Sequence, residues 1–344
     1  MWQDFFEQQQ IADEQGKTST IASIWNSPDF HDGFFSTLTE HGLLLASGND
    51  AANFLHNQLS NDVEHLGIDE VRRAAYCTVK GRMLASFVYW KTEAGIVLQT
   101  NADIQAGIQK RLQMFVLRAK VTLQNMNDTY LSLGLGGRRA AEVLHAWFPE
   151  LPVAAYAQVS NQHGTLIRFT DVLDTPRYQW VCPVSLMATA WDQLQQQLRR
   201  APVTDWNLSE IQAGIAHVNG LTQEKFVPQM INFELIGGVN FRKGCYPGQE
   251  IVARSQYLGK LKRRMALARI PATGFSDGME IFNEAQPDQP CGVIVNVQAD
   301  SPDSSLALVE MTLADQEVRI HCTSADGPLL QLLPLPYEIK DITR

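Results

Sequence analysis

The sequence has no run of about 18 or more apolar residues, which argues against a membrane-spanning helix. Its start, residues 1–10, lacks the positive region and the apolar region of a secretory signal. Positive charge is also scarce, since the formal net charge is −9 at pH 7. An acidic chain does not bind nucleic acid through its overall charge, so an anionic partner needs a local basic patch.

Cysteine is sparse, and the cysteines form no CxxC pair. The five are odd in number and far apart: Cys77, Cys182, Cys245, Cys291 and Cys322. This pattern argues against a disulfide framework and against a preformed zinc site, so we predict no metal ligands. The expected location is a reducing cytoplasm, with no membrane as a partner.

The N-terminal part of the sequence predicts a mixture of strands and helices. Residues 1–35 are polar and poorly periodic, and we expect a helix or a loose arm that packs on the body. Asp50 is expected to cap a helix that carries Phe54, Leu55 and Leu59 on one face. Further on, apolar residues at helical spacing predict an amphipathic helix over residues 102–118.

A β-hairpin is predicted around Lys80-Gly81, because residues 73–79 and 82–90 both have the composition of strands. The pattern changes near Thr129, where a unit of alternating strands and helices begins. After residue 262 short strands are separated by Gly, Pro, Asp and Ser, which is typical of a small antiparallel barrel or sandwich. The expected strands of this last part are residues 262–270, 290–298, 305–312 and 316–321.

The segment around Cys245 is the main motif of the chain. It reads Asn240-Phe241-Arg242-Lys243-Gly244-Cys245-Tyr246-Pro247-Gly248-Gln249-Glu250. Its glycines and proline predict a tight loop, and residues 249–258 have a helical pattern that Gly259 would end. Cys245 would then lie just before a helix N-terminus, beside Arg242 and Lys243.

Such surroundings favour the thiolate of Cys245, which is the form that ligates iron or attacks an electrophile. The alternative is that Cys245 is a small buried hydrophobic residue, as most free cysteines are. A Cys–His nucleophilic pair is a further alternative, and His217 is the nearest candidate along the chain. The position of His217 after an apolar helix face favours a structural role for it.

Residues 242–264 form a basic segment within the acidic chain. It contains one carboxylate, Glu250, and seven cations: Arg242, Lys243, Arg254, Lys260, Lys262, Arg263 and Arg264. Two interpretations remain open, a solvated strand edge that lysines protect and a site for an anion such as the phosphates of RNA. Glu250 and Arg254 are four residues apart and can pair on one helix face.

The residues 243–250 match the signature K-G-C-[FY]-x-G-Q-E of YgfZ-like proteins, and the sequence is similar to that family from about residue 38 to 340. Three further stretches resemble the family: Phe226-Val227-Pro228-Gln229, residues 75–83 and residues 333–337. The resemblance implies an α+β fold with a three-domain ring like that of the glycine-cleavage T-protein, and a C-terminal small antiparallel β-barrel. We expect a discontinuous folate-binding domain at 1–125 plus 203–260, a middle α/β domain at 126–202 and the barrel at 261–344.

The same resemblance implies that the central opening binds tetrahydrofolate or a derivative. It also implies a role in assembly or maintenance of iron–sulfur client enzymes, including those that thiomethylate tRNA. The family cysteine associated with that role is Cys245 here, a possible cluster contact. The expected folate-binding residues are Trp206, which matches a family tryptophan but could be an ordinary core residue, with Lys243, Gln249, Glu250 and Arg254.

An aminomethyltransferase of the T-protein type needs a carboxylate near the folate nitrogen, on the strand after the hairpin glycine. The matching stretch, residues 81–87, contains no Asp or Glu, so we predict that this chain is not an aminomethyltransferase. The favoured hypothesis is a folate-binding accessory protein. A folate-dependent one-carbon transferase with another catalytic group and an RNA-binding scaffold that uses residues 242–264 remain as alternatives.

Overall fold

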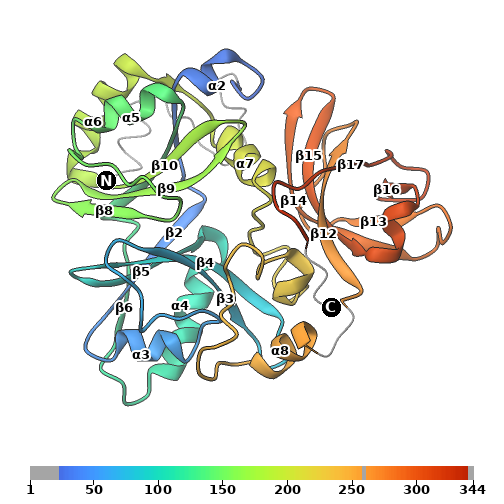
Figure 1. Ribbon diagram of the computed structural model, residues 1–344, viewed down its shortest axis with the longest axis horizontal. Coiled ribbons are helices and arrows are strands. Elements are labelled where there is room, and N and C mark those ends of the chain that lie inside the picture. Colours follow the sequence, from blue (N-terminus) through green and yellow to red (C-terminus); the bar gives the residue numbers. More distant parts are fainter. Residues whose placement is uncertain (1–22, 258–260, 340–344) are drawn as a thin grey trace.

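The structure is a computed structural model that describes residues 23–257 and 261–339. Figure 1 shows three lobes, each built on one β-sheet, with helix α7 (Val203–Gln212) between the middle lobe and the C-terminal lobe. The predicted α+β class is confirmed. No helix among these residues is long and apolar enough to cross a membrane.

The first lobe has a five-stranded sheet in the order β3-β4-β5-β2-β6. Its strands are β2 (His41–Ser47), β3 (Val71–Cys77), β4 (Met83–Thr92), β5 (Gly95–Asn101) and β6 (Thr122–Asn125), and its helices are α3 (Ala51–His56) and α4 (Ala102–Val116). The predicted hairpin is present, because β3 and β4 pair antiparallel around a turn in which Gly81 has a φ of +71°. Helix α4 buries Ile104, Ile108 and Leu112 against this sheet, as its apolar spacing predicts.

Two local predictions in this lobe are wrong. Asp50 occupies the N-cap position of α3, but its side chain makes no capping hydrogen bond and instead accepts one from the backbone N–H of Lys120 at 2.7 Å. Helix α3 ends at His56, so Leu59 is not on it. Leu59 instead forms an isolated β-bridge with Tyr76, because the chain has already turned back toward the sheet.

The middle lobe has a six-stranded sheet in the order β11-β1-β7-β10-β9-β8. Its strands are β1 (Phe34–Thr37), β7 (Tyr130–Gly136), β8 (Gln158–Asn161), β9 (Gly164–Val172), β10 (Thr175–Pro183) and β11 (Arg199–Arg200), and its helices are α2 (Pro28–Asp32), α5 (Arg138–Leu144) and α6 (Val184–Gln197). Residues 28–37 are therefore a short helix and a sheet strand, while residues 1–22 of the predicted arm lie outside the described residues. Strand β1 is fully buried and pairs antiparallel with β7, although it precedes the whole first lobe in the sequence.

The C-terminal lobe has a six-stranded antiparallel sheet in the order β16-β13-β14-β15-β12-β17. Its strands are β12 (Arg263–Ile270), β13 (Glu280–Asn283), β14 (Pro290–Ser301), β15 (Ser304–Thr312), β16 (Ile320–Cys322) and β17 (Gln331–Leu333), with a 3₁₀ turn η2 (Leu313–Glu317). The segment 328–333 bonds to β16 at one end and to β12 at the other, which joins the two edges as a barrel requires. Most of the strand predicted at 316–321 is instead this 3₁₀ turn and the approach to β16.

The segment 203–257 runs between the lobes and contains α7, the 3₁₀ turn η1 (Pro228–Ile231) and α8 (Gln249–Tyr257). Helix α7 packs against β1 of the middle sheet and against β14 and β15 of the barrel. It therefore holds these two lobes together (Figure 1). The division into domains at 1–125 plus 203–260, 126–202 and 261–344 stays a prediction.

Candidate functional site

Cys245 is exposed, whereas the other four cysteines are buried. It lies in a loop of residues 240–248, which we call the cysteine loop, directly before α8. Burial raises the pKa of Cys77 to about 12 and that of Cys291 to about 11, so these thiols stay protonated. Among the cysteines, Cys245 is therefore the one that a partner or reagent can reach.

The cysteine loop is fixed at both ends by backbone contacts. At its start, the N–H of Asn240 donates to the carbonyl of Ser60 at 2.9 Å. At its end, Gly248 has a φ of +80°, and a Cβ there would lie 2.3 Å from the carbonyl oxygen of Thr78. Between them Tyr246 is buried. Cys245 thus lies on a loop whose two ends are held by contacts with the first lobe.

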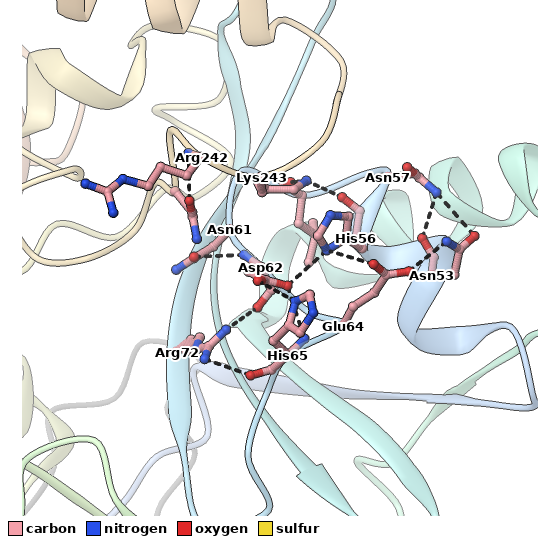
Figure 2. Close-up of polar contacts among 12 residues, drawn as sticks. Asn53, His56, Asn57, Asn61, Asp62, Glu64, His65, Arg72, Arg242 and Lys243 are labelled. Atoms are coloured by element: carbon pink, nitrogen blue, oxygen red, sulfur yellow. Dashed lines mark hydrogen bonds and ion pairs between the residues drawn. The ribbon is translucent and has the colours of Figure 1, made fainter.

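Lys243 does not extend into solvent beside Cys245 but turns toward the end of α3 (Figure 2). Its Nζ donates to the carbonyls of His56 and Leu59, the second at 2.7 Å, and lies 4.9 Å from the centre of the Tyr246 ring. Burial lowers the pKa of Lys243 to about 8, although the charges of Asp62 and Cys245 act in the opposite direction. A substantial fraction of this amine is therefore neutral at mildly alkaline pH.

A polar cluster supports Lys243 from below, as Figure 2 shows. The Nδ1 atoms of His56 and His65 lie 3.1 Å and 2.9 Å from the carboxylate oxygens of Asp62. Burial raises the pKa of Asp62, but hydrogen bonds from the backbone and ring of His65 outweigh it, so the net pKa lies below the usual value. Within residues 23–257 and 261–339 no group of three or more His, Cys, Asp or Glu side chains is arranged to hold a metal ion.

The other predicted residues of this region lie around the loop. Arg242, Glu250 and Arg254 are exposed, and the Arg242 side chain points away from the His56–Asp62 cluster (Figure 2). Gln249 donates from Nε2 to the carbonyl of Lys243 at 3.4 Å. The expected pair of Glu250 with Arg254 is not among the ion pairs that the described side chains make.

The basic segment 242–264 is not one continuous cationic surface. The interpretation as an anion site is therefore wrong for its last two residues, Arg263 and Arg264. Arg264 is buried and pairs with Glu234, and it also donates to the carbonyl of Gln229 at 3.0 Å. Arg263 forms a bidentate pair with Glu310 of the neighbouring strand. Each of these two charges is therefore paired with a carboxylate of the protein. In the described part of the segment, the exposed cations that remain are Arg242, Arg254 and Lys262, and Lys260 lies outside the described residues.

Trp206 lies on α7 and is almost completely buried. Its ring meets Phe169 edge to face at 6.1 Å, and the guanidinium of Arg177 lies 5.3 Å from the ring centre. Gly134 packs directly on the ring, so closely that a Cβ there would be 2.4 Å from it. Trp206 therefore packs between α7 and the middle sheet and is not exposed to solvent.

A cavity of about 460 Å³ lies where the first lobe, α7 and the barrel meet, and we call it the central cavity. Sequence reasoning missed it, because its walls come from stretches far apart in the chain. The lining residues are Glu40, His41, Asn101, Ala102, Asp103, Asn207, Glu210, Ile211, Ile215, His217, Asn219, Leu221, Asp277, Asn296, Val297 and Gln298. They include neither Trp206 nor any residue of the cysteine loop.

Glu210, on α7, is the buried carboxylate of the central cavity. One of its oxygens pairs with Arg177, and the other accepts a hydrogen bond from Nε2 of His217 at 3.0 Å. Arg73 approaches the same carboxylate at 3.8 Å. Burial raises the pKa of Glu210, but Arg177 and His217 outweigh that effect and hold the pKa far below its usual range.

His41 also lines the cavity, with its ring centre 6.1 Å from that of His217. The side-chain amide of Gln99 donates to its Nδ1 at 3.0 Å. Burial, followed by the charge of His217, lowers the pKa of His41 to about 3, so this ring is neutral at physiological pH. His217 thus belongs with Glu210 and His41, and no hydrogen bond among the described residues joins it to Cys245.

The walls of the central cavity are rich in carboxylates and side-chain amides. Asp103 accepts from the N–H of Gly220 at 2.8 Å, and Asp277 accepts from the side-chain amides of Asn219 and Asn296 at 2.6 Å and 3.0 Å. With Glu40 and Glu210 these make four carboxylates, whereas no Lys or Arg is among the lining residues. Such a cavity favours a ligand with several N–H donors over one whose buried part is anionic.

Comparison with known proteins identifies both the fold and the family. The structure superposes on the aminomethyltransferase T of the glycine cleavage system from Bartonella henselae with a TM-score of 0.74, at 16% identity over 90% of this chain and 87% of that one. The fold is therefore that of the glycine-cleavage T-protein. No family model matches the sequence.

Curated relatives narrow the class further. The "tRNA-modifying protein YgfZ" of Colwellia psychrerythraea is 31% identical over 229 residues, covering 66% of this chain and 69% of that protein. The protein of the same name from Klebsiella pneumoniae is 28% identical over 311 residues, covering 89% of this chain and 93% of that one. The chain belongs to the YgfZ family.

Proposed function

We propose that this protein is a folate-binding accessory protein that supports assembly or maintenance of iron–sulfur enzymes and hence thiomethylation of tRNA. The observation that carries the proposal is the exposure of Cys245, alone among the five cysteines, on a loop fixed by Gly248 and Asn240. The name "tRNA-modifying protein" of the curated relatives supports the link to tRNA. Cys245 is the functional thiol in this proposal.

The folate site that we propose is the central cavity. Its volume of about 460 Å³ lies within the range of about 300 to 1,000 Å³ that is usual for small-molecule sites. The ring system of tetrahydrofolate presents an amino group and ring N–H groups, which are donors that match the carboxylate of Glu210 and the other wall acceptors. Trp206 then supports the site indirectly, because its packing fixes the helix that carries Glu210.

Lys243 lies in the cysteine loop, and Gln249, Glu250 and Arg254 lie on α8 directly after it. None of the four lines the central cavity, so we assign them to the support of Cys245. The exposed cations Arg242, Arg254 and Lys262 are the part of the basic segment that supports contact with tRNA. Contact with RNA through so few exposed cations would be weak, and added salt should weaken it further.

Complementation tests the role of Cys245. In a bacterial strain that lacks its own YgfZ protein, the wild type should restore iron–sulfur enzyme activity and tRNA thiomethylation, and Cys245→Ala should not. Cys291→Ala, the same substitution at a buried thiol, is the matched control and should rescue. Equal rescue by wild type and Cys245→Ala would show that the thiol carries no function.

Titration tests the folate site. Tetrahydrofolate should bind in the micromolar range, roughly −8 kcal/mol, and should change the tryptophan fluorescence. Glu210→Gln should weaken binding by removing the charged acceptor, whereas Glu250→Gln on α8 should leave it unchanged. Absence of binding by the wild type at millimolar ligand would refute the folate assignment.

A folate-dependent one-carbon transferase is the second candidate, and one observation favours it. Glu210 and His217 form a hydrogen-bonded pair in the wall of the cavity. This pair would transfer the proton in place of the T-protein carboxylate that β4 lacks. Incubation with tetrahydrofolate and an aminomethyl donor distinguishes the two. Formation of methylene-tetrahydrofolate that His217→Ala abolishes would favour the transferase.

A further inference from the structure

Helix α4 ends in a surface that the proposed function does not use. We call residues 110–120 the α4 end. Three large apolar side chains of this segment lie in solvent, since Met114, Phe115 and Leu117 are 60%, 45% and 87% exposed. The last fully buried residue of the helix is Leu112, so these three side chains are not part of the core. Exposed apolar side chains that lie close together mark an interaction site more often than single ones do.

Leu117 is held in a conformation that leucine rarely adopts. It follows α4 with a φ of +45° and a ψ of −103°. It is the second residue of a tight turn that a hydrogen bond closes, from the N–H of Ala119 to the carbonyl of Val116 at 2.8 Å. Glycine usually occupies this position of such a turn, because a Cβ is strained there. The fold thus combines backbone strain and an exposed apolar side chain at one residue, and such outliers gather at functional sites.

The turn that carries Leu117 is fixed from its far side. The backbone N–H of Lys120 donates to the carboxylate of Asp50 at 2.7 Å, and the carbonyl of Lys120 accepts from the N–H of Asp50 at 3.4 Å. Gly48 packs on the same carbonyl, so closely that a Cβ there would lie 2.1 Å from its oxygen. Leu117 is therefore already ordered, and a partner that contacts it loses little conformational entropy on binding.

The α4 end is also cationic. Residues 104–127 contain Lys110, Arg111, Arg118 and Lys120 and no Asp or Glu, although the net charge of the chain is −9. Lys110, Arg118 and Lys120 are exposed, and none of the three forms an ion pair with a carboxylate in the part of the chain that the structure describes. The charge that complements them is negative and has to come from a partner.

The kinds of side chain at the α4 end favour a protein partner over RNA. Single-stranded RNA binds through bases that stack on aromatic rings, and Phe115 is the one aromatic residue of the stretch 104–127. Met114 and Leu117 are aliphatic and offer no ring for a base. An apolar centre with polar residues around it is instead the usual anatomy of a contact between proteins, and methionine adapts well to such contacts.

The α4 end lies far from the central cavity. Asn101, Ala102 and Asp103, at the start of the helix, line the cavity. Helix α4 has 15 residues, so its other end is roughly 20 Å away. A change at the α4 end should therefore leave the binding of a ligand in the cavity intact.

We propose that the α4 end docks a protein whose contact face has carboxylates around an apolar centre, and that this protein is an iron–sulfur client enzyme. The choice of the client rests on the proposed function, whereas the surface itself rests on the exposure, the turn and the charges of the α4 end. The three exposed apolar side chains form the centre of the contact, and the three exposed cations form its rim.

The test is binding of the full-length protein to a purified iron–sulfur enzyme that thiomethylates tRNA, measured by biolayer interferometry at low and at high salt. Leu117→Asp should weaken binding about tenfold, because it removes an apolar anchor and repels carboxylates. High salt should weaken binding of the wild type through the rim cations. Leu173→Asp is the matched control, since Leu173 is 50% exposed with a φ of +51° in the middle lobe, and it should bind like the wild type.

Leu117→Gly separates docking from folding. Glycine adopts a positive φ without strain, so this variant should unfold at no lower urea concentration than the wild type. It should nevertheless bind the enzyme more weakly, because the apolar side chain is gone. A residue with a structural role alone would lose stability and binding together.

Two results would overturn the docking surface directly. One is a wild type that does not bind the enzyme, and the other is a Leu117→Asp variant that binds it as tightly as the wild type. A third result, binding of purified tRNA that Leu117→Asp abolishes while enzyme binding is unchanged, would assign the surface to RNA and overturn the proposal as well.

Complementation distinguishes this proposal from the proposed function. Rescue of tRNA thiomethylation by the wild type that Leu117→Asp retains in full would overturn the docking surface and leave the role of Cys245 intact. Failure of the wild type to rescue would overturn the proposed function, whereas weaker enzyme binding by Leu117→Asp would still support the surface.

Discussion

Gly248 of the cysteine loop packs directly on Gly81 of the β3–β4 turn. A Cβ on Gly248 would lie 2.7 Å from both the N and the Cα of Gly81, and a Cβ on Gly81 would lie 3.4 Å from the carbonyl oxygen of Gly248. Both glycines have positive φ values, +80° and +71°. The hairpin and the loop that carries Cys245 are therefore joined at a point where neither backbone tolerates a side chain.

Gly248→Ala should destabilise the protein by about 3 kcal/mol, because it combines a strained φ with a clash against Thr78 and Gly81. Gly237→Ala is the matched control, since Gly237 has a φ of +75° but nothing within 4 Å of its Cβ position. The control should cost only about 1 kcal/mol of strain. Urea unfolding measures both, and equal losses would show that the Gly248–Gly81 contact does not hold the loop.

The amine of Lys243 should react as an unusually weak base. Its pKa is lowered to about 8 by burial, so competitive acylation followed by mass spectrometry should show a midpoint near that pH. An unfolded lysine has a pKa of about 10.4, so the folded state loses its proton first and stability should rise with pH between about 8 and 10.4. The acylation should be compared with that of the exposed Lys80 in the same sample. A midpoint near 10 for Lys243 would contradict the prediction.

The cysteine loop was predictable from the sequence because its determinants are local. Glycines and a proline at short spacing specify a turn, and the change to helical spacing at Gln249 marks the start of α8. The hairpin at Gly81 was predictable for the same reason. The contact between Gly248 and Gly81 was not, because the two residues are far apart in the chain and glycine leaves no apolar pattern.

The central cavity could not be predicted, since its walls come from the first lobe, α7 and the barrel. A weak signal did exist in α7, where Asp205, Ser209 and Glu210 lie among apolar residues and prove to be buried. The charge of residues 242–264 failed as a predictor for a related reason. A count of cations does not tell which of them meet a buried carboxylate, as Arg264 meets Glu234.

His41 should make stability fall as the pH is lowered. Its pKa is lowered to about 3 in the fold, whereas an unfolded histidine has a pKa of about 6.5, so between these values the unfolded state binds more protons. The fold therefore loses stability on acidification from pH 6.5, by about 1 to 2 kcal/mol at pH 5. His41→Gln should flatten this part of the profile, while His65→Gln, at an exposed position, is the control. An unchanged profile in His41→Gln would show that another group is responsible.

Arg264 should be a determinant of stability and not of RNA contact. Its guanidinium is buried and paired with Glu234, so Arg264→Ala leaves an unpaired buried carboxylate and should cost about 3 to 5 kcal/mol. Lys262→Ala, two residues earlier and exposed, should change stability by less than about 0.5 kcal/mol.

Burial raises the pKa of Glu234, although the charge of Arg264 acts in the opposite direction. Removing the arginine should therefore raise this pKa further and leave the carboxyl neutral. Part of the loss should therefore be recovered in the double variant Arg264→Met/Glu234→Gln, because neither charge is then buried alone. Urea unfolding of the wild type, Arg264→Met, Glu234→Gln and the double variant measures this coupling, and additive losses in the double variant would show that the two side chains do not act as a pair.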